Sequence, residues 1–137
     1  MSVPVNQRSE GKLQAIVKAR ELATYTIRIT NNKKIFDIEY QEALTNKIIG
    51  AALEIYVLAF SANEIRANSR EGIEERLRIQ RMARNKCNEL ISLINIAHQI
   101  FHLRARRVKY WSGLANETKR LIAAWASSDM NRLKAMT

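Results

Sequence analysis

The chain has 137 residues, a formal net charge of +10 and a sequence pI near 10.2. Hydrophobic residues make up 47% of it, with only one proline and four glycines. This length and composition suit a single helical domain with one core, and they exclude a disordered or loop-rich protein.

Residues 1–10 contain the single proline, Pro4, and are expected to form an N-terminal arm. Apolar residues at steps of three and four then predict a helix over residues 12–30. Its inner face is expected to carry Leu13, Ile16, Val17, Ala23, Thr24 and Ile27. Asparagines and lysines at 31–34 predict its end, because asparagine tolerates the left-handed conformation and lysine suits a helix C-terminus.

The second predicted helix spans residues 38–68, with Asp37 as its N-cap. Its core stripe is expected to be Thr45, Ile49, Ala52, Tyr56, Ala59, Phe60 and Asn63. Further apolar residues point away from that stripe, namely Leu53, Val57, Leu58 and Ile65. A helix that is apolar around most of its circumference is usually buried on more than one side, either at a central position in the bundle or against another subunit. We assign these residues to an oligomer interface. The other alternative is that Val57 and Leu58 are ordinary exposed apolar residues.

Ser69 is expected to cap a third helix that ends near His102. Its inner face is expected to carry Ile73, Leu77, Ala83, Cys87, Leu90, Ile91, Ile94, Ala97, His98 and Phe101. Its first half is strongly basic, and the arginines that point away from the apolar stripe are Arg70, Arg78, Arg81 and Arg84. Its second half carries another apolar strip, which we add to the oligomer interface: Leu93, Ile96 and Ile100.

A basic connection over residues 103–109 precedes a fourth helix that is expected to end near Ser127. The inner residues of this helix are Trp111, Leu114, Ala115, Thr118, Leu121, Ile122 and Trp125. Residues 128–137 are expected to form a basic tail. Long helices with short connections predict an all-α, antiparallel up-down four-helix bundle, with one domain over residues 1–137.

The positive charge favours a polyanionic partner, most often nucleic acid. In an up-down bundle, the connection at 31–37 and the one at 103–109 lie at the same end. We interpret the basic residues of that end and of the third helix as nucleic-acid-binding through phosphate contacts: Lys33, Lys34, Arg70, Arg78, Arg81, Arg84, Arg104, Arg106, Arg107 and Lys109. The alternative is a solvated basic face, partly neutralised by neighbouring glutamates. Tyrosines could stack on bases, although helical tyrosines more often pack: Tyr25, Tyr40 and Tyr110.

The sequence contains no pattern that indicates catalysis. It has no phosphate-binding glycine loop and no H-E-x-x-H motif. His98 and His102 have a spacing that could serve one metal, but Cys87 lies about 16 Å away along the helix. We therefore expect no catalytic residue, metal or cofactor, with His98 in a core or interface role and Cys87 as a small buried hydrophobe.

Cysteine usage and hydropathy bear on the compartment. The single cysteine excludes an internal disulfide and is typical of a reducing compartment. The N-terminal residues lack the apolar core of a signal peptide, and no unbroken run of about 18 apolar residues occurs. We therefore expect a cytoplasmic protein without a membrane span.

Short motifs along nearly the whole chain carry a family resemblance. The first are Ser2-Val3-Pro4, Arg8, Lys12-Leu13-Gln14, Lys18-Ala19-Arg20-Glu21-Leu22-Ala23 and Tyr25-Thr26-Ile27. The next are Asn32, Lys34, Phe36, Tyr40, Leu44-Thr45-Asn46-Lys47-Ile48, Ile55-Tyr56 and Ala62-Asn63, and the last are Phe101-His102, Tyr110-Trp111, Gly113-Leu114 and Trp125. This pattern resembles the bacterial four-helix bundle protein family. That family includes the accessory variability determinant (Avd) proteins of diversity-generating retroelements and is related to proteins encoded in intervening sequences of 23S ribosomal RNA genes.

The resemblance implies a homopentameric barrel of four-helix bundles with a strongly positive surface. It implies a non-enzymatic accessory protein that binds a reverse transcriptase and template RNA or cDNA, and so supports mutagenic copying of a template repeat into a target gene. The alternative is a stand-alone oligomeric RNA-binding bundle associated with ribosomal RNA intervening sequences. The chain departs from the family at Asp37, where a proline is common, and at residues 104–107, which are basic where acidic residues and a proline are common. The family's electrostatics therefore do not transfer to that connection.

Overall fold

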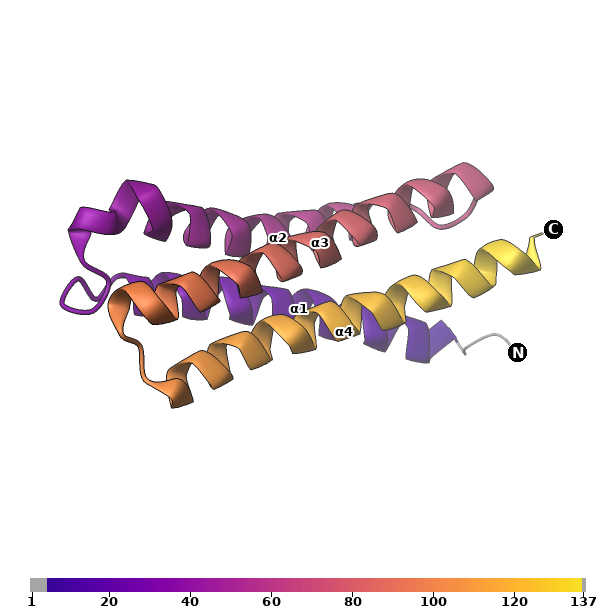
Figure 1. Cartoon of the computed structure of the whole chain (residues 1–137). Coiled ribbons are helices and arrows are strands. Elements are labelled where there is room, and N and C mark those ends of the chain that lie inside the picture. The colour runs from indigo at the N-terminus through magenta and orange to yellow at the C-terminus, as the bar shows by residue number, and fades with distance from the viewer. Residues whose placement is uncertain (1–4, 137) are drawn as a thin grey trace.

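The computed structural model describes the backbone of residues 5–136 and the side chains of residues 11–136. Four long helices lie side by side (Figure 1): α1, Val5–Thr30; α2, Asn46–Glu64; α3, Arg70–Phe101; and α4, Ala105–Ala135. Each helix packs against the one before and the one after it, and α4 closes the ring against α1. The described residues contain no strand, so the expected all-α four-helix bundle is confirmed.

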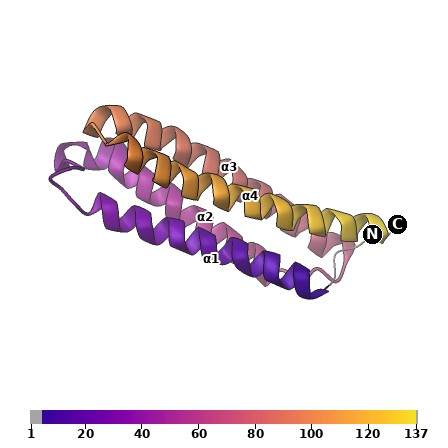
Figure 2. The same cartoon turned by 90° about the horizontal axis from the view of Figure 1, so that it is seen from below.

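The helices run alternately up and down the bundle. The connections at residues 31–37 and 102–104 lie at one end, which we call the loop end (Figure 1). The start of α1, the connection at 65–69 and the end of α4 lie at the other, which we call the terminal end and which Figure 2 shows from a second side. Basic residues far apart in sequence can therefore meet at the loop end.

Both predicted helix caps are present. The Asp37 side chain accepts a hydrogen bond from the Glu39 amide at 2.9 Å, although the element that it caps is a 3₁₀ turn, Ile38–Tyr40. A π-helical segment, Gln41–Thr45, follows and leads into α2. Ser69 Oγ accepts from the Gly72 amide at 3.0 Å and so caps α3.

The expected element boundaries were wrong at four places, one of which is the connection expected at 103–109, because α4 already begins at Ala105. The first helix begins at Val5, so residues 5–10 are helical rather than an arm, and residues 1–4 lie outside the described part. The second helix ends at Glu64, not near residue 68. The fourth helix continues to Ala135, so the expected tail at 128–137 is helical up to that residue.

The expected inner face of α1 was only partly correct, since Ala23 is buried and Ile16 packs against the core but the other large apolar residues of that face do not. The buried residues are Ala15, Ala19, Leu22, Ala23, Thr26 and Thr30, whereas Leu13 is 60% exposed and Val17 and Ile27 are exposed as well. The small alanines let the neighbouring helices approach closely. The polar side chain of Thr26 can be buried without an unsatisfied hydroxyl, because that hydroxyl accepts a hydrogen bond from Trp111 Nε1 at 3.0 Å. Periodicity favoured the larger apolar residues, but packing selected the smaller ones.

The core face of α2 is rotated from the expected stripe. Its buried residues are Ile48, Ala51, Ala52, Ile55, Ala59 and Ala62. Phe60 is exposed, and Ile49, Tyr56 and Asn63 are only half-buried. Because α2 is apolar around most of its circumference, its own pattern does not select one face. The contacts with α1 and α3 make that selection.

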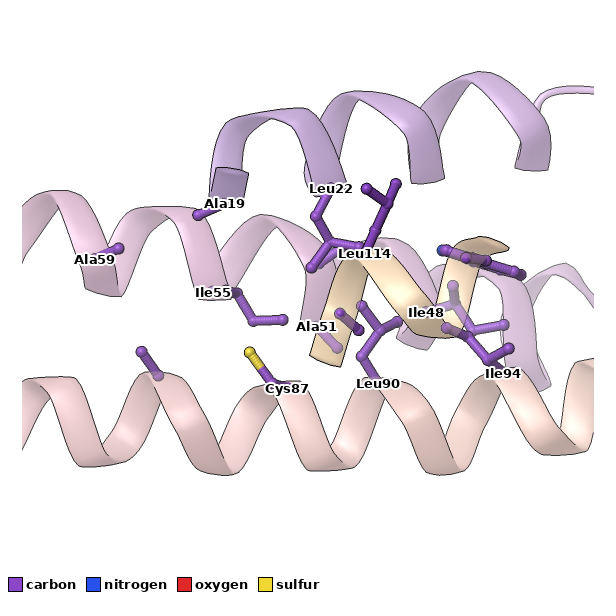
Figure 3. Close-up of a cluster of buried hydrophobic side chains, with 14 of the residues drawn as sticks. Ala19, Leu22, Ile48, Ala51, Ile55, Ala59, Cys87, Leu90, Ile94 and Leu114 are labelled. Atoms are coloured by element: carbon purple, nitrogen blue, oxygen red, sulfur yellow. The ribbon is translucent and has the colours of Figure 1, made fainter. Parts of the chain in front are cut away.

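The middle of the core is aliphatic (Figure 3). Ala19 and Leu22 of α1 face Ile48, Ala51 and Ile55 of α2 and the Cys87–Ile94 stretch of α3. Aromatic side chains close the loop end: the Phe36 ring centre lies 4.9 Å from that of Phe101 and 6.0 Å from that of Trp111. The predicted inner face of α3 is largely buried, but it also includes Arg76 and Gln80, which were not expected there.

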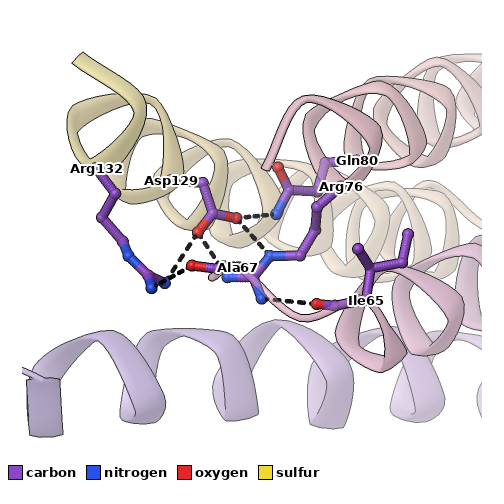
Figure 4. Close-up of polar contacts among 6 residues, drawn as sticks. All are labelled: Ile65, Ala67, Arg76, Gln80, Asp129 and Arg132. Carbon is purple, nitrogen blue, oxygen red and sulfur yellow. Dashed lines mark hydrogen bonds and ion pairs between the residues drawn. The ribbon is translucent and has the colours of Figure 1, made fainter. Parts of the chain in front are cut away.

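A buried ion pair closes the terminal end of the core (Figure 4). Arg76 Nη2 and Nε donate to the two carboxylate oxygens of Asp129 at 2.6 and 2.8 Å, and Gln80 Nε2 donates to the same group at 2.8 Å. The remaining Arg76 nitrogen donates to the Ile65 carbonyl at 3.2 Å. The guanidinium carbon also lies 5.3 Å from the centre of the Trp125 ring. These contacts join α3, α4 and the connection at 65–69, and they explain why α4 continues through its polar residues at 127–129.

One helical segment, Ile38–Glu64, is long and apolar enough to cross a membrane by length and composition, with a mean hydropathy of 1.4. The sequence-based expectation was stricter because it required an unbroken apolar run. A core helix of a soluble bundle meets the same criteria, so this property is weak evidence for a membrane span.

Replacing Asp129 with alanine should strongly destabilise the bundle. The substitution leaves the Arg76 guanidinium buried without its charge partner, which costs about 3 to 5 kcal/mol in free energy of unfolding. Urea denaturation followed by far-ultraviolet circular dichroism measures the loss. The double variant Arg76→Met/Asp129→Leu should recover most of it, because neither charge then remains buried. A loss no larger than that of Glu117→Ala, which breaks an exposed pair with Arg120, would contradict this role.

Cys87 should be protected from thiol reagents in the folded protein. Burial raises the pKa of its thiol from 9.0 to about 12, so almost no thiolate exists near neutral pH. Reaction with Ellman's reagent should be slow in buffer and rapid in guanidinium chloride. Because the folded pKa is raised, the thiol's contribution to stability is present below pH 9 and is lost as the pH rises towards 12. The control variant Cys87→Ala/Asn88→Cys carries an exposed thiol on the same helix and should react rapidly in both conditions. Equal reaction rates for the wild-type protein and this variant in buffer would refute the protection.

Candidate nucleic-acid interface

The loop end brings basic residues of two connections together. Lys34 and Ile35 of the first connection line a pocket of about 380 Å³ with His102 and Arg104 of the second connection and Arg107 of α4. The Phe36 and Phe101 rings, tilted by 52° with 4.9 Å between their centres, pack the first connection against the end of α3. Cations that lie about 70 residues apart in sequence therefore share one surface, because an up-down bundle places alternate connections at the same end.

The cations of the loop end are largely free of acidic partners. Within the described residues, none of them forms a salt bridge: Lys33, Lys34, Arg104, Arg106, Arg107 and Lys109. Lys33 instead donates to the Thr30 carbonyl at 2.9 Å and to Gln41 Oε1 at 2.6 Å, which holds its ammonium group at the end of α1. The positive charge of this end is therefore not cancelled locally.

Two tyrosines lie among these cations. The ring centres of Tyr25 on α1 and Tyr110 on α4 are 5.0 Å apart in an edge-to-face arrangement. Both line a hollow with Arg104, Arg106 and Arg107. Tyr25 is half-buried and also contacts Trp111 edge-on, whereas Tyr110 is 52% exposed. Burial raises the pKa of Tyr25 while the nearby charge of Arg107 opposes the rise, so the phenol stays neutral at physiological pH.

Two arginines of α1, Arg20 and Arg28, extend this surface and were missed by the sequence reasoning. They line a groove between α1 and α4 that also contains Tyr25 and Tyr110. We call the combined surface the basic-aromatic groove, made of Arg20, Tyr25, Arg28, Arg104, Arg106, Arg107 and Tyr110. Glu21 also lines it, and its carboxylate is paired with Lys18 at 3.0 Å. The two arginines lie eight residues apart, on one side of a helix. That spacing could have placed both arginines on the outer surface of α1. They were missed because the sequence reasoning assigned a partly wrong inner face to this helix.

The arginines of α3 form a separate and more neutralised group. Arg78 makes two hydrogen bonds to Glu75, at 2.6 and 3.0 Å, and Arg70 lies 3.8 Å from Glu74. The hydrogen bond from Arg78 lowers the pKa of Glu75. Arg81 is exposed, and Arg84 is half-buried with a buried Nε that has no hydrogen-bond partner in the described part of the chain. The ten basic residues predicted from sequence thus divide between the loop end and the first half of α3.

Tyr40, the third tyrosine singled out from sequence, lies at the loop end but packs edge-on against Phe101, with 5.8 Å between ring centres. It does not line the basic-aromatic groove. Its aromatic face is thus partly used in closing the core.

The residues assigned to an oligomer interface are only partly exposed. Val57 is 56% exposed and Ile96 is 53% exposed, and Leu53 and Ile100 are exposed as well. Leu58 and Leu93 instead pack against the core, and Ile65 is half-buried in the connection after α2. Exposed apolar residues that the prediction did not include are, among others, Leu13, Val17, Ile27, Ile38 and Phe60. The surplus apolar surface therefore exists, but with a different membership.

The described residues contain no group of three or more histidine, cysteine, aspartate and glutamate side chains that could hold a metal ion. His98 is half-buried, and His102 ends α3 in a left-handed conformation with φ 53°. Cys87 lies in the core. The two histidines thus occupy packing and capping positions.

Comparisons of the chain with protein-family models, with curated proteins and with solved structures found no match. The resemblance to the bacterial four-helix bundle family therefore remains an expectation from the sequence.

Proposed function

We propose that this protein is a non-enzymatic, nucleic-acid-binding accessory protein that holds RNA or cDNA at the loop end of its bundle. The basic-aromatic groove is the observation that carries the proposal. It combines five arginines that form no salt bridge within the described residues with an exposed tyrosine ring. Single-stranded nucleic acid is bound by this combination of backbone-tracking cations and stacking aromatics.

The contacts in such a complex would be largely independent of base sequence. Arginine side chains bind phosphate oxygens through paired N–H groups, which position the strand without reading it. Tyr110, the more exposed of the two tyrosines, supplies a face on which a base can stack. Each neutralised phosphate releases counterions, so binding should weaken as salt rises.

We further propose that the protein acts as an oligomer, with a homopentamer as the form that the family resemblance implies. Exposed apolar residues on α2 and α3, chiefly Leu53, Val57, Ile96 and Ile100, support an interface between copies. Five copies at +10 each would carry +50. Such a charge repels itself strongly and favours a bound polyanion.

The identity of the protein partner rests on the resemblance alone. It points to the reverse transcriptase of a diversity-generating retroelement and to the template RNA, in the cytoplasm. The second candidate is a stand-alone RNA-binding bundle associated with ribosomal RNA intervening sequences. The positive charge of the loop end suits RNA binding in this case as well. A neighbouring reverse-transcriptase gene with paired repeats favours the first, and a surrounding ribosomal RNA gene favours the second.

The triple variant Arg104→Ala/Arg106→Ala/Arg107→Ala should weaken binding to single-stranded RNA by about tenfold or more at low salt. The slope of log affinity against log salt should also become shallower by about 2, because each lost phosphate contact contributes about 0.7. Fluorescence anisotropy with a labelled oligonucleotide measures both. Helix content should be unchanged, since Arg104 makes no side-chain capping bond to α4.

The matched control, Arg70→Ala/Arg78→Ala/Arg81→Ala, removes the same formal charge from α3. It should weaken RNA binding much less, because two of these arginines already have glutamate partners. Equal weakening by both triple variants would move the site away from the loop end. An affinity for RNA that does not change between low and high salt would overturn the proposal as a whole.

Light scattering on nuclease-treated protein should give a mass near 79 kDa, which is five times the 15.8 kDa of one chain. Val57→Asp combined with Ile96→Asp should reduce that mass, because it places charges in the apolar interface. Glu89→Gln, an exposed change on α3, is the control that should leave the mass unchanged. A monomeric native protein would sink the oligomer proposal without affecting the RNA-binding test.

A further inference from the structure

A second pocket lies at the terminal end, opposite the basic-aromatic groove. It has a volume of about 460 Å³, which is in the range of small-molecule sites. Lys12 of α1, Asn63 of α2, Arg66 of the following connection, Arg76 of α3, and Trp125 and Arg132 of α4 all line it. We call it the terminal pocket; all four helices contribute to its wall.

The buried ion pair gives this pocket a fixed floor (Figure 4). Both oxygens of Asp129 accept hydrogen bonds from Arg76, and one also accepts from Gln80. Arg132 Nη2 donates to the Ala67 carbonyl at 2.7 Å, which places its guanidinium at the connection. The side chains that define the floor are therefore held by hydrogen bonds.

The pocket wall carries an excess of positive charge. Among the described residues, four cationic side chains and one carboxylate line it, a net of three positive charges. The carboxylate, Asp129, pairs with Arg76 at 2.6 Å and lies 3.8 Å from Arg132. Within the described residues, Lys12 and Arg66 take part in no salt bridge or side-chain hydrogen bond. The site is therefore suited to an anion of more than one charge.

Polar atoms in the same wall also lack partners. Trp125 is only 4% exposed, and its Nε1 is buried without a hydrogen-bond partner among the described residues. The Asn63 Oδ1 atom of the wall is in the same condition. Leaving such groups unpaired costs about 1 to 3 kcal/mol each, so buried polar groups are normally satisfied. Both atoms are closed off from solvent, so they mark a polar lining without reaching into the pocket themselves.

We propose that the terminal pocket binds a small phosphate monoester, with the phosphate held by Lys12, Arg66 and Arg132. A phosphate monoester carries a charge of about −1.5 to −2 near pH 7 and several strong acceptor oxygens. Arginine pairs with such oxygens in a bidentate fashion. The volume leaves room for an organic group beside the phosphate. This site is separate from the proposed nucleic-acid interface and does not depend on it.

Binding can be measured with adenosine 5′-monophosphate and inorganic phosphate as probes, by titration calorimetry and tryptophan fluorescence at constant ionic strength. The chain has two tryptophans, and Trp111 is fully buried among the aromatic rings of the loop end. A fluorescence change should therefore persist in Trp111→Phe and disappear in Trp125→Phe. Both probes should bind saturably, whereas adenosine, which lacks the phosphate, should not.

The variant Lys12→Gln/Arg66→Gln should weaken binding of adenosine 5′-monophosphate at least tenfold. Lys47→Gln/Arg120→Gln, which removes the same charge from exposed positions outside the pocket, should not. If the first variant fails to fold, Arg66→Gln alone, in the connection, provides the same comparison. Absence of saturable binding at millimolar probe, equal affinity for adenosine, or equal weakening in the two double variants would each overturn the proposal.

Two sources of the phosphate can be separated by competition. A short RNA with a 5′-phosphate that competes with the probe, when its 5′-hydroxyl counterpart does not, identifies a nucleic-acid end. Competition by the mononucleotide alone identifies a free small molecule. The arginine variants of the loop end should leave these results unchanged, so failure here is distinguishable from failure of the proposed function.

Discussion

The buried contact between Arg76 and Asp129 joins α3, α4 and the connection at 65–69. Both groups are removed from water, which is tolerable only when they meet each other in good geometry and their remaining hydrogen-bonding groups are satisfied. That requirement fixes the register of α3 against α4. Through Ile65 it also fixes the connection after α2. The polar residues at 127–129, which look like a helix end in the sequence, are held in α4 by this pair.

The two ends of the bundle handle charge in different ways. At the terminal end, Arg76 is brought inside and neutralised by Asp129, whereas Lys12 and Arg66 line the pocket without a salt bridge among the described residues. At the loop end, the rings of Phe36, Phe101 and Trp111 close the core, so the nearby cations remain outside and without acidic partners. An uncompensated positive surface beside exposed tyrosine is suited to a flexible polyanion. The two anion sites that we propose therefore differ in the way each end of the bundle is closed.

The apolar residues outside the core connect this charge to assembly. Positions such as Leu13, Val17 and Val57 remain exposed because alanines occupy the places where the helices meet. Small residues allow close packing inside each bundle and leave the larger ones for contacts elsewhere. If copies associate through those residues, their positive surfaces combine, which strengthens the attraction for nucleic acid. In this interpretation, packing and function both depend on where the alanines lie.

The sequence by itself determined the number and order of the helices and the caps at Asp37 and Ser69, because a cap is a local feature of the chain. It also determined that Lys34 and Arg104 share one end of the bundle, because an up-down topology places alternate connections at the same end. It could not determine which face of α1 or α2 is buried, because both helices have apolar residues on several sides and their neighbours make the selection. Nor could it identify Arg76 as a core residue, since its partner Asp129 lies 53 positions away. The same misassigned face hid Arg20 and Arg28. Periodicity describes one helix at a time, whereas burial and charge pairing are properties of two or more helices in contact, and only the tertiary structure supplies those.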